Sequence, residues 1–119
     1  MDVKRLRLKR AYDPPSDDDG LRVLVDRLWP RGLKRDAARI DHWVKDVSPS
    51  AELRGWFAHD PERWTEFQKR YRAEIKKNGE ALAALKELMK GQKRLTFLFA
   101  AKDEEHNNAV ALRNYLATL

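Results

Sequence analysis

The sequence contains no cysteine, and only five glycines and five prolines occur among its 119 residues. The lack of cysteine excludes disulfide bonds, thiolate nucleophiles, cysteine-ligated zinc and iron–sulfur clusters, and it suits a reducing cytoplasm. No apolar run approaches the roughly 18 residues of a membrane-spanning helix, and no apolar stretch follows the basic residues at the N-terminus. We therefore expect a cytoplasmic protein that is neither exported nor membrane-spanning.

Charged residues are abundant, with 25 Lys or Arg against 19 Asp or Glu, which gives a net charge of +6. Hydrophobic residues make up 42% of the chain, a globular composition rather than a disordered one. A chain of this length removes roughly 65% of its unfolded surface from water on folding, which supports one core but not two. We expect residues 1–119 to form a single domain.

The N-terminal part of the sequence predicts two strands. Over residues 3–12, Leu6 and Leu8 alternate with basic residues, as in a half-buried strand, and the row of like charges favours the edge of a sheet. Residues 13–20 form a loop rich in Pro, Asp and Gly, and a second strand follows over 21–26. Because this loop is shorter than a usual parallel crossover, we expect antiparallel pairing of the two strands unless the loop contains a short helical turn.

Helical patterns fill the middle of the chain. Ile40, Trp43, Val44 and Val47 follow the spacing of one helix face, with Asp36 in place to cap the start. Further helices are expected around 53–57, from Asp60-Pro61 onward, over 82–89, and from Asp103 or Glu104 to the C-terminus.

Residues 94–101 are apolar on both faces, which is typical of a covered, central strand. The order of strands and helices indicates the α/β class. We predict a small sandwich with a short three-stranded sheet, an edge strand at the N-terminus and about five helices.

Polar side chains cluster after the second and third predicted strands. In open α/β sheets, ligands bind outside the carboxyl ends of the strands. If the second and third strands are parallel, the two loops converge there. The candidate ligand-binding residues are Asp26, Arg27, Trp29, Arg31 and Gly32 in the first loop, and Lys102, His106, Asn107 and Asn108 in the second.

These residue types suit a small anion bearing phosphate or carboxylate. Arginine forks bind such groups in a bidentate manner, and Trp29 is placed to cover an aromatic or sugar ring. A purely structural interpretation also fits, in which Asp26 and Arg27 pair locally and Trp29 belongs to the core. We assign no catalytic residue, although Asp26 is the most plausible buried base.

Other catalytic or cofactor motifs are weak or missing. His42 and His59 match no zinc-binding spacing and are interpreted as structural or surface residues, and residues 17–19 as a turn rather than a calcium loop. No Gly-x-Ser-x-Gly elbow, Walker loop or Gly-x-Gly-x-x-Gly loop occurs. We therefore expect neither a metal nor a cofactor.

The basic balance supports an alternative function, a nucleic-acid or protein interaction module. Residues 4–10 and 69–77 are basic, and Trp56 or Trp64 would offer stacking surfaces. Helical tryptophans at this spacing usually belong to the core, however, and the basic residues alternate with acids. We weigh this alternative below the anion site.

Taken together, several segments closely resemble the YeaO-like family, bacterial proteins with a domain of unknown function. They are Tyr12-Asp13-Pro14-Pro15, Asp19-Gly20, Arg22 to Gly32, Trp43, Pro49-Ser50, Leu53-Arg54, Trp56-Phe57 and Leu98 to Lys102. The resemblance implies a cytoplasmic bacterial α/β protein and no established activity, cofactor or partner. The family pattern falls on residues 26, 27 and 29–32, and on Lys102 and Asn107.

One position departs from that pattern. Family members often carry histidine after this asparagine, whereas this chain has Asn108, whose amide does not exchange a proton near neutral pH. The departure favours ligand binding over acid–base catalysis, unless His106 substitutes from two residues away.

Overall fold

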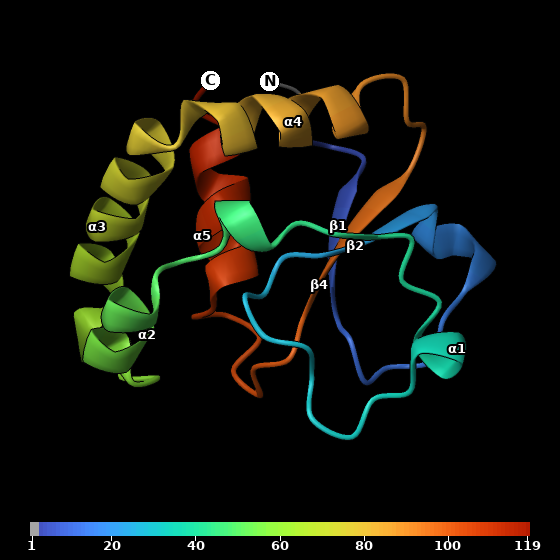
Figure 1. Ribbon diagram of the computed structural model, residues 1–119, viewed down its shortest axis with the longest axis horizontal. Helices are drawn as coiled ribbons and strands as arrows, with labels where there is room; N and C mark the ends of the chain where they lie inside the picture. The colour runs from blue at the N-terminus through green and yellow to red at the C-terminus, as the bar shows by residue number, and fades with distance from the viewer. Residues whose placement is uncertain (1–2) are drawn as a thin grey trace.

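Residues 3–119 are described by a computed structural model; the expected domain also includes Met1 and Asp2, which lie outside the described residues (Figure 1). The strands are β1 (Leu6–Arg10), β2 (Leu21–Leu24), β3 (His42–Trp43) and β4 (Leu95–Phe99). The α-helices are α1 (Arg35–Ala38), α2 (Ala51–Phe57), α3 (Trp64–Lys77), α4 (Gly79–Met89) and α5 (Asn108–Leu116). Short 3₁₀ helices span Asp17–Asp19, Lys45–Val47 and Pro61–Arg63.

The four strands form one parallel sheet in the order β1-β4-β2-β3. The predicted edge position of β1 and the central position of β4 are confirmed, and every residue of β4 is buried. The first two strands do not pair with each other: each is a parallel neighbour of β4, and the loop between them contains the short helical turn that was the stated exception to antiparallel pairing. Because β4 is apolar on both faces, it inserts between β1 and β2, and Phe97 lies beside both Leu8 and Val23.

A short helical turn makes the parallel arrangement possible within few residues. Ser16 caps the 3₁₀ helix Asp17–Asp19: its hydroxyl accepts from the Asp18 N–H, and its own N–H donates to the Asp19 carboxylate at 2.9 Å. The turn returns the chain to the starting edge of the sheet. Gly20 then takes a left-handed φ of 64°, where it lies against the backbone of Arg94.

The sheet has four strands and not the predicted three, because part of the predicted helix over residues 40–47 is strand β3. Its backbone bonds to β2, with the Val44 N–H donating to the Leu24 carbonyl at 3.0 Å. Trp43 packs on one side of the sheet and Val44 on the other, so the four apolar residues do not share a helix face. Asp36 caps nothing; it lies inside α1, which begins after Lys34.

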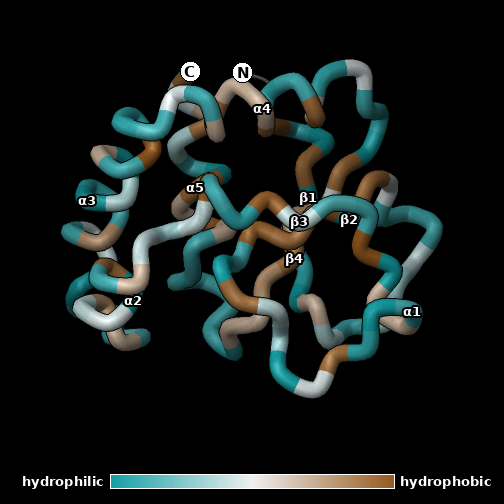
Figure 2. The backbone as a smooth tube through the Cα atoms, in the orientation of Figure 1, coloured by the Kyte–Doolittle hydropathy of each residue, from teal (hydrophilic) through white to brown (hydrophobic). Residues whose placement is uncertain are grey.

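One face of the sheet carries the main core. Helices α2, α3 and α5 stand beside this face and α4 runs along one end (Figure 1), and hydrophobic segments gather along the strands (Figure 2). Phe67, Tyr71 and Ile75 of α3 are buried, as their spacing predicts, against Leu112 of α5 and Phe97 of β4. The count of five helices is confirmed.

The opposite face is covered by a loop instead of a long helix. Leu24 and Leu98 point toward this side, and Trp29, Leu33 and Trp43 pack against them. The rings of Trp29 and Trp43 meet edge to face, with centroids 5.4 Å apart. The segment from the end of β2 to β3 is therefore fixed in place by its tryptophans.

A buried ion pair joins the β1–β2 connection to the sheet. Arg22 and Asp19 are 4% and 1% exposed, and their charged atoms lie 2.5 Å apart, while Lys9 reaches the same carboxylate at 3.2 Å. Arg22 also donates to the Ala38 carbonyl at 2.9 Å. Burial raises the pKa of the Asp19 carboxyl, but hydrogen bonds from Ser16, Lys9 and Arg22 outweigh it and hold the pKa below its usual value.

We predict that Asp19→Asn lowers the free energy of unfolding by about 3 kcal/mol at pH 7, because Arg22 is left buried without its counter-charge. Since the folded-state pKa of Asp19 is lowered, this stability is present above its ordinary pKa of 3.8 and is lost as the pH falls through the folded value. Urea unfolding of both proteins from pH 7 to pH 2 measures the difference. The exposed neighbour variant Asp17→Asn is the control, and an equal loss in the two variants would refute the prediction.

Gly20 and Gly32 provide a second test, because both have positive φ but only Gly20 is crowded. A Cβ atom at residue 20 would lie 2.2 Å from the Arg94 carbonyl oxygen, whereas a Cβ at residue 32 meets nothing within 4 Å. Gly32→Ala is expected to lose about 1 kcal/mol from the left-handed backbone alone. Gly20→Ala is expected to lose at least about 3 kcal/mol. Thermal and urea unfolding compare the two variants.

Candidate functional site

The carboxyl ends of β2 and β4 lie next to each other, because these two strands are parallel neighbours. The chain that leaves each strand therefore borders the same space, an open pocket of about 1010 Å³. The lining includes Asp26, Arg27, Trp29, Arg31, Lys102, His106, Asn107 and Asn108 of the predicted set. Gly32 is not part of the lining.

Asp26 follows β2 and links the two sides of the pocket. Its carboxylate accepts from the Ala100 N–H at 2.9 Å and from the Asn108 side-chain amide at 3.1 Å. The same amide donates to the Val25 carbonyl at 2.9 Å, and the Trp43 indole N–H donates to the Asp26 carbonyl at 2.7 Å. Burial raises the pKa of the Asp26 carboxyl, against the lowering effect of these donors and of the Arg54 charge.

Two side chains of the first loop already make hydrogen bonds within the protein. Arg27 donates from Nε to the Pro49 carbonyl at 2.9 Å and from a terminal nitrogen to the Ser48 carbonyl at 3.0 Å. The Trp29 indole N–H donates to the Leu33 carbonyl at 2.7 Å, and its ring packs on Trp43. Arg27 therefore fixes the start of α2, and Trp29 belongs to the smaller core around Leu24 and Leu98 on the opposite face of the sheet.

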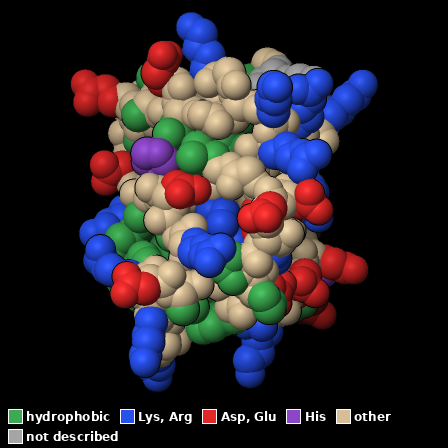
Figure 3. Space-filling view, turned by 90° about the vertical axis from the view of Figure 1, so that its right-hand side faces the viewer, with side chains coloured by type: hydrophobic (Ala, Val, Ile, Leu, Met, Phe, Trp, Pro, Cys, Tyr) green, Lys and Arg blue, Asp and Glu red, His purple; other side chains and the backbone are tan. Residues whose placement is uncertain are grey.

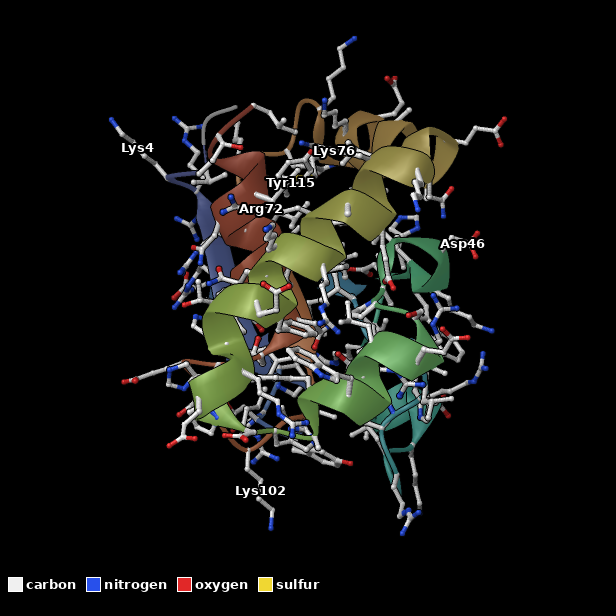
Figure 4. The ribbon with its side chains drawn as sticks, turned by 90° about the vertical axis from the view of Figure 1, so that its left-hand side faces the viewer. Lys4, Asp46, Arg72, Lys76, Lys102 and Tyr115 are labelled. Atoms are coloured by element: carbon white, nitrogen blue, oxygen red, sulfur yellow. The ribbon has the colours of Figure 1, made fainter. Side chains whose placement is uncertain are left out.

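Arg31 and Lys102 are the exposed cations of the predicted set. No ion pair of either residue occurs within residues 3–119. The backbone of Arg31 is held by the Tyr12 hydroxyl, which donates to its carbonyl at 2.8 Å. Lys102 extends away from the body of the protein (Figure 4). Both charges border the pocket and are open to solvent.

The segment before α5 forms a tight turn around Asp103. One carboxylate oxygen of Asp103 accepts from the N–H groups of Glu105 and His106, and the other lies 3.0 Å from His106 Nδ1. These contacts, led by the Glu105 N–H, lower the pKa of the Asp103 carboxyl. The predicted start of the last helix at 103 or 104 is wrong, because Asn107 is the cap and accepts from the Val110 N–H at 3.0 Å.

Arg54, which α2 brings to the pocket, was not among the predicted site residues. Its Nε atom is buried and has no hydrogen-bond partner, an unusual state for a guanidinium. The available signal was its place in the Leu53-Arg54 segment of the family resemblance, next to the Trp56-Phe57 pair. Tyr12, Phe57, His59 and Phe67 also border the pocket and were not predicted there.

No group of three or more His, Asp or Glu side chains suited to a metal ion occurs within residues 3–119. In the same part of the chain, no helix is both long and apolar enough to cross a membrane.

The fold and the pocket define the class of protein: a small α/β domain with four parallel strands and an open pocket at the carboxyl edge of its sheet. The chain belongs to the YeaO-like family, since residues 5–119 match the family model described as the inactive DUF488-N3 subclade. It is similar to the uncharacterized protein YeaO of Escherichia coli strain K12, with 39% identity over 96% of this chain and 98% of that protein.

Mycobacterial proteins are also similar. The uncharacterized proteins Rv3073c of Mycobacterium tuberculosis strain H37Rv and Mb3100c of Mycobacterium bovis are each 43% identical, over 94% of this chain and 93% of the relative. No solved structure matches the chain significantly.

The contact between Asn108 and Asp26 leads to a pH-dependent prediction. Asn108→Asp replaces a donor by a carboxylate facing both Asp26 and the Val25 carbonyl, so we expect a loss of about 3 kcal/mol at pH 7. One of the two carboxyl groups then has a raised pKa in the folded protein. The loss of stability therefore shrinks as the pH falls through that pKa and this group takes up a proton. Urea unfolding from pH 8 to pH 4 follows the change.

The matched control is Asn114→Asp on the same helix, because Asn114 donates to Gln68 outside the pocket. A loss in Asn108→Asp that does not vary with pH would contradict the prediction.

Proposed function

We propose that this protein binds a small phosphate- or carboxylate-bearing molecule in the pocket at the carboxyl ends of β2 and β4, without converting it. The observation that carries the proposal is the excess of positive charge around the pocket. Four cations, Arg27, Arg31, Arg54 and Lys102, border it against two acids, Asp26 and Asp103. Opposite charge concentrates an anion in such a site, and guanidinium groups bind its oxygens.

The four cations differ in whether their side chains are already bound within the protein, and this difference indicates which of them contact the ligand. Arg27 donates from two of its three nitrogens to backbone carbonyls, so its guanidinium is anchored and fewer of its donors remain for a ligand. Arg31, Arg54 and Lys102 make no ion pair within residues 3–119, in contrast to Arg22 and Arg94, which each pair with an aspartate. We assign ligand contact to the first three.

Binding without turnover is supported by the groups around Asp26. Both of its carboxylate oxygens already accept hydrogen bonds, and its side-chain neighbour is the amide of Asn108, which transfers no proton near neutral pH. The description of the family model as inactive agrees with this proposal.

The absence of cysteine supports a place in the reducing cytoplasm.

The alternative, a nucleic-acid or protein interaction module, has weaker support. The face shown in Figure 3 mixes Lys and Arg with Asp and Glu and presents no continuous basic stripe. Trp56 is covered by the guanidinium groups of Arg63 and Arg70, and Trp64 packs against Phe67. Neither indole offers an open face for a base.

Titration calorimetry with inorganic phosphate and with citrate tests the proposal. Arg31→Gln and Lys102→Gln are each expected to weaken binding about three- to tenfold, because each removes one charge bordering the pocket. Lys69→Gln, an exposed residue of α3 outside the pocket, is expected to change affinity less than twofold.

Failure of both anions to bind the wild-type protein would refute the pocket. Retention of RNA or DNA that falls steeply with salt and is unchanged in Arg31→Gln and Lys102→Gln would instead establish the interaction module.

A further inference from the structure

The pocket is much larger than a lone anion requires. Its volume of about 1010 Å³ lies at the upper end of the range for sites that enclose drug-sized ligands. A phosphate or carboxylate held by two or three cations fills only a small part of such a space. The residues that line the rest of the pocket therefore indicate what else the ligand carries.

This part of the lining contains rings. Phe57 and Phe67 stack with centroids 4.3 Å apart, and His59 lies 6.5 Å from Phe57. The rings of His106 and Trp64 meet edge to face, with centroids 5.4 Å apart, and Trp64 stacks on Phe67. Four of these rings border the pocket, and we call them the ring wall: His59 is exposed and His106 half-buried, whereas Phe57 and Phe67, 5% and 2% exposed, lie behind them in the main core.

The free charge lies beside this wall. Arg54 precedes Phe57 by three residues on α2, so the two side chains leave the same side of the helix. The buried Nε of Arg54 has no hydrogen-bond partner within residues 3–119. An unsatisfied guanidinium donor next to aromatic rings is suited to an anionic group attached to a flat ring.

The backbone at the end of α2 supports a functional role for His59. Ala58 and His59 both have positive φ, 48° and 57°, although neither is glycine. Ala58 is the left-handed C-cap of α2, with its N–H donating to the Arg54 carbonyl, and His59 continues the turn in a conformation that is uncommon for a residue other than glycine. Here they direct the chain so that an exposed imidazole borders the pocket.

We propose that the ligand of this pocket is an anion that carries a flat ring, with its charged group bound by Arg54 and its ring against His59 and His106, the accessible members of the ring wall. This inference rests on the proposed function, since it takes anion binding in the pocket as given. The ring contact then falls on His59 and His106 and not on Trp29, whose ring packs edge to face on Trp43.

Three phosphates that differ only in what they carry test the proposal by titration calorimetry at one salt concentration. Phenyl phosphate is expected to bind the wild-type protein about tenfold tighter than inorganic phosphate and about threefold tighter than cyclohexyl phosphate. Equal affinities for phenyl phosphate and inorganic phosphate would overturn the ring inference and leave the proposed function standing. Equal affinities for phenyl and cyclohexyl phosphate would overturn the requirement for a flat ring.

Single substitutions distinguish the contribution of the ring contact to binding from the contribution of the Arg54 charge. His59→Asn removes the ring but keeps a residue that tolerates a left-handed backbone, so phenyl phosphate is expected to bind about fivefold more weakly and inorganic phosphate within twofold of wild type. Arg54→Gln is expected to weaken both ligands about tenfold. Arg5→Gln, a control at an exposed residue just before β1 and outside the pocket, is expected to change neither.

A parallel loss for both ligands in His59→Asn would overturn the role of the ring wall. Failure of all three phosphates and of citrate to bind the wild-type protein would overturn the proposed function itself.

Discussion

The carboxylate of Asp26 is the interaction on which the pocket depends. It sits where β2 ends, and its two oxygens accept from the backbone after β4 and from the first residue of α5. Three segments distant in sequence are thereby tied at one point, and Asn108 completes the tie by also donating to the Val25 carbonyl. Because parallel strands have no hairpin to align their ends, such a side-chain connection determines how the neighbouring loops lie.

A second aspartate, Asp19, has the same connecting role at the opposite end of the sheet. The carboxylate of Asp19 is held by Ser16, Lys9 and Arg22, so it joins the β1–β2 connection to strands β1 and β2. The hydroxyl of Thr96 on β4 donates to the Asp19 carbonyl at 2.7 Å. Each end of this small sheet thus has one aspartate that gathers backbone and side-chain donors. The apolar faces between them are left to Val, Leu and Phe.

The sequence predicted the parts of the fold whose patterns are local. The apolar run of β4, the alternation in β1 and the stripe of α3 each follow from neighbouring residues and were assigned correctly. The segment around Trp43 was wrong because helical spacing arose by coincidence, with Trp43 and Val44 packing on opposite faces of the sheet. Short strands are fixed by their partner's backbone, and no local pattern contains that partner.

For the site, the sequence located the loops but did not distinguish the arginines. Arg27 and Arg54 both belong to the segments that resemble the family, yet one is anchored by two backbone carbonyls and the other has an unpartnered Nε. The difference arises from tertiary packing, because Ser48 and Pro49 bring their carbonyls to Arg27 only after the chain has folded. An arginine's role in such a pocket is decided by which acceptors lie within reach. Residue type and spacing predict where the positive charge collects, whereas the backbone around each guanidinium determines which donors are free for a ligand.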